Sequence, residues 1–251
     1  MMSSRRVSVP TPTAAMPPPP SRRRGSSWKS AASRFDVPGA GDGRSLLLIA
    51  CGALLRELKT LVRLNGWDHV TLRCLPAELH NRPEQIPGAV RALIEESGED
   101  FDEILVGYGD CGTGGRLDAL LAEVGARRLP GAHCYAFFAG EERFEALHEE
   151  EPGSFYLTDF LVRHFDRLVF RGLGLDRHPE LLPTYFGNYR RVVYLAQTRS
   201  PALDAQARAC ARLLGLDFEL RATGLAPFKT ALAIGAGRAA STEGRELPWS
   251  A

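Results

Sequence analysis

The sequence feature that most limits the fold is a buried-strand pattern followed at once by a helical one. Residues 46–50 (Leu-Leu-Leu-Ile-Ala) form a continuous apolar run, which is typical of a strand covered on both faces of a parallel sheet. Apolar residues then recur at helical spacing over residues 54–62, until Asn65-Gly66 supplies a left-handed stop. This succession predicts a layered α/β fold.

The same alternation continues along the first half of the chain. We expect further strands over residues 69–74 and 103–106, with helices between Pro83 and Gly98 and over residues 117–124. Because crossovers between parallel strands are right-handed, this order predicts an open, mostly parallel, Rossmann-like α/β sheet.

The second half repeats the design in a shorter form. We expect a strand over residues 191–196, a helix over 202–214 and a strand over 216–220. The predicted fold is therefore two similar Rossmann-like lobes, of which the second is truncated. The predicted domain boundaries are a first lobe at 45–140, a connecting segment at 141–190, a second lobe at 191–235 and a disordered tail at 236–251. Within the connecting segment, the pattern predicts an acidic helix from residue 141 and a half-buried strand around residues 155–157.

Charge is distributed unevenly between the N-terminal tail and the body. Residues 1–44 are rich in Pro and Ser and hold eight Arg or Lys against two Asp, a net +6, and this composition predicts disorder. The whole chain carries +1, so residues 45–251 carry 1 − 6 = −5, which gives no electrostatic reason to bind nucleic acid.

Localisation is predicted from apolar runs and cysteines. No apolar run approaches the roughly 18–20 residues that cross a bilayer, and no apolar stretch follows Arg5-Arg6 as a secretory signal requires. Five cysteines without such a signal favour a reducing compartment. We therefore expect a cytoplasmic protein without a membrane partner.

Thiols and imidazoles follow the ends of the predicted strands. They are Cys51 after the first strand, Cys74 at the end of the second, His80 in the loop that leaves it, Cys111 after the third, and His133-Cys134 at the start of a potential fourth. Because the carboxyl ends of parallel strands meet at one edge of a sheet, we expect these side chains to converge there.

Three interpretations of this cluster remain open. A metal site would use Cys51, His80, Cys111 and Cys134, since thiolate and imidazole suit zinc or an iron centre. The same residues could line a ligand pocket without metal, or simply pack in the core. Cys210, on a predicted helix of the second lobe, is interpreted as a packing residue.

The loop over residues 107–115 contains five glycines in nine residues. It formally matches G-x-G-x-x-G, but it follows the third strand, and Arg127-Arg128 stands where a dinucleotide site needs an acidic residue. The glycines instead favour close approach of a small-molecule ligand to the backbone. The ligand-binding candidates are Tyr108, Gly109, Gly112 and His133. Cys111 is also a candidate nucleophile, activated by His80 or His133.

Several motifs together resemble an uncharacterised family, the domain of unknown function 1638, over residues 45–225. They are Cys51-Gly52, Leu79-His80 with Pro83, Tyr108-Gly109 with Cys111-Gly112, the segment from Cys134 to Gly140, and Pro152-Gly153 through Tyr156-Leu157-Thr158. Genes of that family tend to lie beside corrinoid-dependent methyltransferases. The resemblance implies an accessory role in corrinoid- or folate-linked methyl transfer, with a corrinoid as a potential cofactor and a corrinoid protein or methyltransferase as partner.

The sequence leaves catalysis open. The leading hypothesis is a metal- or ligand-binding accessory protein of one-carbon metabolism. One alternative is a non-catalytic module that binds a corrinoid, a metal or a methylated compound. A second alternative is a cysteine hydrolase that uses Cys111.

Overall fold

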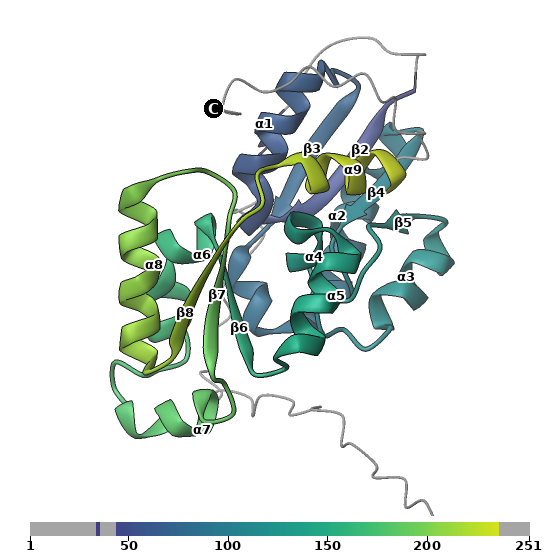
Figure 1. The fold of residues 1–251 in the computed structure, drawn as a ribbon. Coiled ribbons are helices and arrows are strands. Elements are labelled where there is room, and N and C mark those ends of the chain that lie inside the picture. The colour runs from purple at the N-terminus through teal and green to yellow at the C-terminus, as the bar shows by residue number, and fades with distance from the viewer. Residues whose placement is uncertain (1–33, 36–43, 236–251) are drawn as a thin grey trace, which may run out of the picture.

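The computed structural model describes residues 34–35 and 44–235, which form two α/β lobes, each built on a parallel sheet (Figure 1). The first sheet has the strand order β1-β3-β2-β4-β5, and all of its pairings are parallel except that of β1 with β3. Its strands are β1 (Arg34–Phe35), β2 (Leu46–Cys51), β3 (Val70–Leu75), β4 (Glu103–Gly107) and β5 (Arg127–Arg128). The open, mostly parallel sheet predicted from the alternating pattern is confirmed.

The second sheet is parallel and has the order β6-β7-β8. Its strands are β6 (Ser154–Thr158), β7 (Arg191–Ala196) and β8 (Asp217–Ala222). The predicted strand around residues 155–157 is β6, so the segment 141–190 does more than connect the lobes and supplies an edge strand of the second sheet.

Helices cover the sheets and link their strands (Figure 1). They are α1 (Leu55–Asn65), α2 (Ile86–Ser97), α3 (Arg116–Val124), α4 (Tyr135–Ala139), α5 (Glu141–Glu150), α6 (Asp159–Arg163), α7 (Leu182–Phe186), α8 (Pro201–Leu214) and α9 (Ala226–Gly235). Shorter helical segments are η2 (Gly52–Leu54), η3 (Ala77–Asn81), η4 (Pro83–Gln85), η5 (Gly98–Asp100), η6 (Asp166–Phe170) and η7 (Pro179–Leu181).

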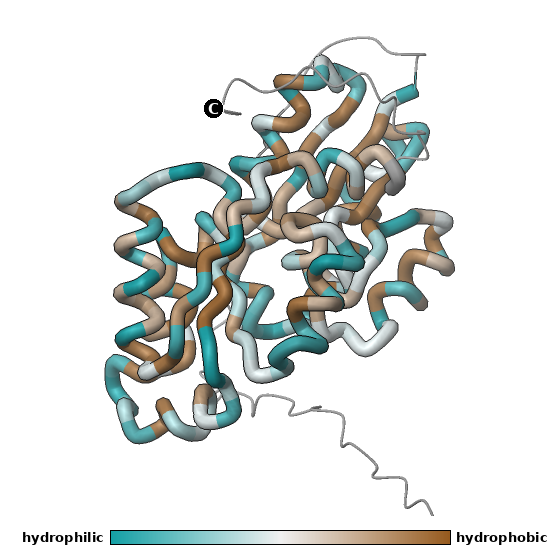
Figure 2. The backbone as a smooth tube through the Cα atoms, in the orientation of Figure 1, coloured by the Kyte–Doolittle hydropathy of each residue, from teal (hydrophilic) through white to brown (hydrophobic). Residues whose placement is uncertain are grey.

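Burial follows the hydropathy pattern of the sequence. All six residues of β2 are buried, because helices cover both faces of the central strand. Helix α1 ends where predicted, since Gly66 adopts φ 59° and its amide donates to carbonyls of the last helical turn. The hydropathy colouring shows apolar strands inside each lobe and polar loops around them (Figure 2).

The last described helix returns from the second sheet to the first lobe (Figure 1). Phe228 of α9 is fully buried, and its ring contacts Phe137 and Phe138 of α4 at centroid distances of 5.8 and 5.2 Å. Residues of both lobes belong to one continuous apolar core.

Two local expectations differ from the structure. The potential fourth strand at His133-Cys134 is instead the entry to α4, because Gly131 turns the chain at φ 100° and only Arg127–Arg128 pair as a strand. Within the predicted N-terminal tail, Arg34–Phe35 pair with the outer edge of β3. The rest of the predicted tails, residues 1–33, 36–43 and 236–251, lies outside the described residues. In the described part, no helix is long and apolar enough to cross a membrane.

Polar contacts join the loop after β3 to the second lobe. The Asn81 side-chain amide donates to the carbonyl of Leu168 at 2.9 Å, and Arg167 forms an ion pair with Glu78. Because η3 carries His80, these contacts place a predicted site residue beside the boundary between the lobes.

A buried carboxyl group of α1 faces the same boundary. Glu57 is only 5% exposed, and its Oε2 atom has no hydrogen-bond partner among the described residues. Burial raises the pKa of Glu57; the negative charge of Asp159 raises it further, whereas its own backbone amide, Arg56 and Arg163 act in the opposite direction.

We expect Glu57→Gln to become more stable relative to the native protein as pH rises. The folded pKa lies above the unfolded value of about 4.3, so the native state binds the Glu57 proton more tightly. This stabilisation is complete below the unfolded pKa and is lost as pH rises through the folded pKa. For each pH unit between those two pKa values, the free energy of unfolding of the native protein falls by at most about 1.4 kcal/mol.

The measurement is the unfolding temperature between pH 4 and 8 for both proteins. Glu95→Gln, which removes a carboxylate from an exposed position of α2, is the control. If the difference in unfolding temperature between Glu57→Gln and the native protein does not change with pH, the raised pKa of Glu57 is contradicted.

Candidate functional site

The two cysteines nearest the strands are buried and remain thiols. Cys51 ends β2 and Cys74 lies in the neighbouring strand β3, and each is 5% exposed. Burial raises the pKa of Cys51 to about 11 and that of Cys74 to about 12. Neither sulfur therefore ionises readily near neutral pH.

The glycine-rich loop after β4 is organised by Asp110. Its carboxylate accepts hydrogen bonds from the Thr113 hydroxyl at 2.7 Å and from the amides of Gly115 and Gly114 at 2.9 and 3.2 Å. Partial burial raises the pKa of Asp110, but these hydrogen bonds outweigh that effect and the pKa is lowered. The hydrogen bonds to Asp110 therefore fix the conformation of the loop that carries Cys111.

Two backbone hydrogen bonds join this loop to the segment before α4. The amide of Asp110 donates to the carbonyl of Gly131 at 3.1 Å, and the amide of Cys111 donates to that of Ala132 at 2.8 Å. Among the described non-glycine residues, Cys111 alone has a positive φ, 48°. Such a conformation costs about 1–3 kcal/mol and is common at functional sites.

Gly109 lets the two segments come this close. A Cβ atom at this position would lie 2.9 Å from the carbonyl oxygen of Gly131, which is shorter than real contacts allow, and a tight 3.0 Å from the amide nitrogen of His133. The second predicted glycine, Gly112, has φ 83°, and a Cβ atom there would lie 3.4 Å from the Pro83 ring. The sequence predicts that glycine lets another group approach the backbone here. At Gly109, the group that comes close is a backbone segment of the protein itself.

The structure brings Cys111 and Cys134 together. The Cys134 thiol donates a hydrogen bond to the Cys111 sulfur, and the backbone amides of Cys134 and Gly109 also donate hydrogen bonds to this sulfur. These hydrogen bonds lower the pKa of Cys111 despite its burial, whereas the same contact raises the pKa of Cys134. Cys111 is therefore the sulfur that ionises first, and Cys134 retains its proton.

A buried hydroxyl lies beside these thiols. Tyr108 is 2% exposed, and its hydroxyl interacts with the Cys51 thiol but has no well-aligned hydrogen-bond partner among the described residues. Burial, and then the neighbouring thiols, raise the pKa of Tyr108, so the hydroxyl keeps its proton. An unpaired buried polar group costs about 1–3 kcal/mol, and a bound ligand that pairs with it would recover that cost.

His80 and His133 flank the thiol pair on solvent-exposed positions. The surrounding protein lowers the pKa of both rings by desolvation, and their mutual repulsion lowers that of His80 further. Both imidazoles are neutral at pH 7.

Aromatic rings connect these histidines to the second lobe. His80 contacts Tyr135 edge-on at 6.2 Å, and His133 contacts Phe144 at 6.4 Å. Tyr135 in turn lies 5.6 Å from Tyr156 of β6. Tyr156 thus has the packing role that its alternating strand pattern predicts.

The predicted convergence is therefore partial. Cys111 and Cys134 are in contact, Cys51 lies close enough to affect the ionisation of Cys134, and Tyr108 lies beside Cys51. Among the residues that the structure describes, no three His, Cys, Asp or Glu side chains are grouped to hold a metal ion. The metal role of Cys51, His80, Cys111 and Cys134 stays a prediction. Cys210 is buried on α8, away from this cluster.

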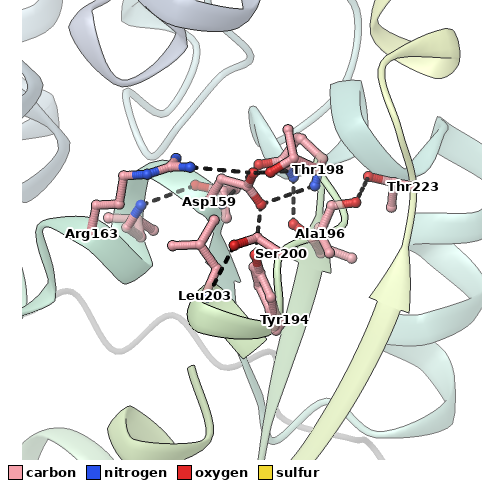
Figure 3. A network of polar contacts seen from close by, with 12 residues as sticks. Asp159, Arg163, Tyr194, Ala196, Thr198, Ser200, Leu203 and Thr223 are labelled. Atoms are coloured by element: carbon pink, nitrogen blue, oxygen red, sulfur yellow. Dashed lines mark hydrogen bonds and ion pairs between the residues drawn. The ribbon is translucent and has the colours of Figure 1, made fainter. Parts of the chain in front are cut away.

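Sequence reasoning missed a second polar cluster, centred on Asp159 (Figure 3). This fully buried carboxylate accepts hydrogen bonds from the Tyr194 hydroxyl at 2.7 Å and from the amides of Gln197 and Thr198 at 3.0 and 3.1 Å. The Thr198 hydroxyl donates a further bond. The available signal was the pair Thr158-Asp159 directly after a strand, where Thr158 caps α6.

The arrangement can be compared with known proteins. No curated protein and no solved structure matches the chain. The model of one family, described as proteins of unknown function (DUF1638), matches residues 74–232, which include Cys111, Cys134, both histidines and the whole second sheet. This match covers more than half of the sequence and spans all of the motifs that carry the resemblance except Cys51-Gly52. The chain belongs to the DUF1638 family.

Proposed function

We propose that this protein is an accessory protein of corrinoid- or folate-linked methyl transfer, in which Cys111 and Cys134 bind a corrinoid or another thiophilic metal group. The observation that supports this proposal best is the contact between the two thiols at a solvent-reachable surface, next to the unpaired Tyr108 hydroxyl. Thiolates are preferred ligands of soft metals. The link to one-carbon metabolism rests on the family resemblance alone.

The donor set suits some metal groups better than others. A structural zinc site takes four protein ligands, and the described residues offer no group of even three. An iron centre held only by protein has the same difficulty. A corrinoid would fit better, because it carries most of the ligands of its metal itself and would need few from the protein, here Cys111 with Cys134 beside it. When bound, it would supply a cobalt that carries methyl groups.

Each side chain then has a distinct part in binding. Cys111 is the ligand, because its lowered pKa makes it the first sulfur to ionise. Cys134 positions that sulfur through its hydrogen bond, and the Tyr108 hydroxyl is free to pair with a polar group of the ligand. The neutral ring of His133 can accept a proton at the exposed rim, where a corrinoid protein or methyltransferase would dock.

The test is titration of the reduced protein with aquocobalamin, followed by visible absorption. A thiolate that replaces water on cobalt changes the spectrum, so the native protein should give a saturable change. We expect Cys111→Ser to weaken this binding at least about tenfold, which is about 1.4 kcal/mol, because a hydroxyl stays protonated at neutral pH.

Cys210→Ser removes a thiol from the second lobe and should bind like the native protein. Circular dichroism should show that both variants are folded. Equal binding by Cys111→Ser and the native protein would overturn the proposal. A parallel titration with Co²⁺ alone separates binding of a bare ion from binding of a corrinoid.

The lowered pKa of Cys111 also favours a second candidate, a cysteine hydrolase. Hydrolysis of an activated thioester by metal-free protein, lost in Cys111→Ser, would support it. A protein that binds aquocobalamin but turns over no substrate would instead support the non-catalytic binding module.

A further inference from the structure

The loops that carry Cys111 and Cys134 are held against each other by the backbone. The hydrogen bonds from Asp110 and Cys111 to residues 131 and 132 fix the two segments side by side. Gly109 removes the side chain that would separate them. The contact between the two sulfurs is therefore a consequence of backbone pairing rather than of two flexible side chains meeting by chance.

The two sulfurs differ in the hydrogen bonds that they receive. Attack on a disulfide needs a thiolate, and hydrogen-bond donors stabilise a thiolate. The Cys111 sulfur has three such donors beside it, the Cys134 thiol and the backbone amides of Cys134 and Gly109. Cys134 is the donor of one of these hydrogen bonds, so its sulfur lies next to the attacking one. An attacking thiol with an adjacent resolving thiol is the arrangement of dithiol redox proteins.

Access to solvent singles out the same pair. Cys111 and Cys134 are partly exposed, whereas Cys51, Cys74 and Cys210 are buried. Burial also raises the pKa of each of those three thiols. Among the cysteines in the described part of the chain, Cys111 and Cys134 are therefore the two that a small molecule in solution can reach.

We propose that Cys111 and Cys134 form a redox-active dithiol that reduces a low-molecular-weight disulfide. The Cys111 thiolate attacks one sulfur of the disulfide, the S–S bond breaks, and one thiolate leaves. Cys134 then transfers its proton to that leaving thiolate and attacks the Cys111 sulfur, which forms the Cys111–Cys134 disulfide and releases the second thiolate. Two electrons pass from the protein to the small disulfide, and solvent protonates the second product.

Oxidation would also act on the proposed function, since it removes both sulfurs from ligand binding. The disulfide would join the glycine-rich loop to the segment before α4 covalently. A corrinoid or metal would then bind only to the reduced protein. The dithiol chemistry itself, however, needs no bound ligand.

The test uses the full-length protein, free of metal and corrinoid, with oxidised glutathione as the probe. We expect the native protein to form an internal disulfide and retain no glutathione. Cys134→Ser should stop at the first step and retain one glutathione on Cys111. Cys111→Ser should form neither product, and Cys210→Ser should behave like the native protein.

Mass spectrometry reads each outcome directly, because trypsin places the five cysteines in five different peptides. A linked pair of peptides that contain Cys111 and Cys134 supports the proposal. A disulfide to Cys51, or no oxidation of folded native protein, overturns it. The aquocobalamin titration is independent: loss of binding with intact dithiol chemistry rejects only the proposed function, and the converse rejects only this inference.

Discussion

We expect Asp159→Ala to lower the free energy of unfolding by about 3–5 kcal/mol, because it removes the acceptor of a buried network. The Tyr194 hydroxyl, the Gln197 amide and the Thr198 amide all donate to this carboxylate, and the residue is fully buried. Alanine leaves these donors without partners in the protein. Urea unfolding followed by circular dichroism measures the loss.

Two variants sharpen this experiment. Asp159→Asn keeps one carbonyl acceptor and should fall between the native protein and Asp159→Ala. Asp166→Ala removes an exposed carboxylate that pairs with Arg171, and it should cost less than about 1 kcal/mol. Similar losses for Asp159→Ala and Asp166→Ala would show that the network in Figure 3 contributes little.

The second large effect is expected from Gly109→Ala. Its Cβ would meet the backbone of Gly131 and His133 at 2.9 and 3.0 Å, so the two segments must separate. We expect a loss of about 1–3 kcal/mol in stability. Because separation also parts the two thiols, the pKa of Cys111 should rise towards that of an ordinary thiol.

Alkylation by iodoacetamide as a function of pH, read on the peptide that contains Cys111, measures this change. Gly88→Ala is the matched control, since nothing lies within 4 Å of its added Cβ and alanine favours its helix. It should leave the alkylation profile unchanged and stabilise slightly. An unchanged profile in folded Gly109→Ala would contradict the role given to the backbone contact.

The strands could be predicted because burial on both faces produces continuous apolar runs. The run at residues 191–196 gave the bounds of β7 directly, and residues 46–50 located β2 to within one residue. The helix α4 was missed because Tyr135–Ala139 is short, apolar and aromatic, a composition that also suits a strand. Its helical form depends on the turn at Gly131, which is a tertiary feature.

The site could be predicted only in part, for a related reason. Convergence at one sheet edge follows from strand direction, so placing Cys51, Cys111 and Cys134 near each other needed no structure. Which two sulfurs touch depends on backbone bonds from the loop of Cys111 to residues 131 and 132, which no local pattern encodes. Asp159 was missed because its partners Tyr194 and Thr198 are distant in sequence.

The return of α9 to the first lobe has a consequence for how the molecule unfolds. Phe228 fills a place beside Phe137 and Phe138 that the first lobe cannot fill by itself, and the chain reaches it only after completing the second sheet. Melting of the second lobe would pull this ring out and expose the apolar face of α4. The two lobes should therefore melt as one cooperative unit, and neither should survive as an excised fragment.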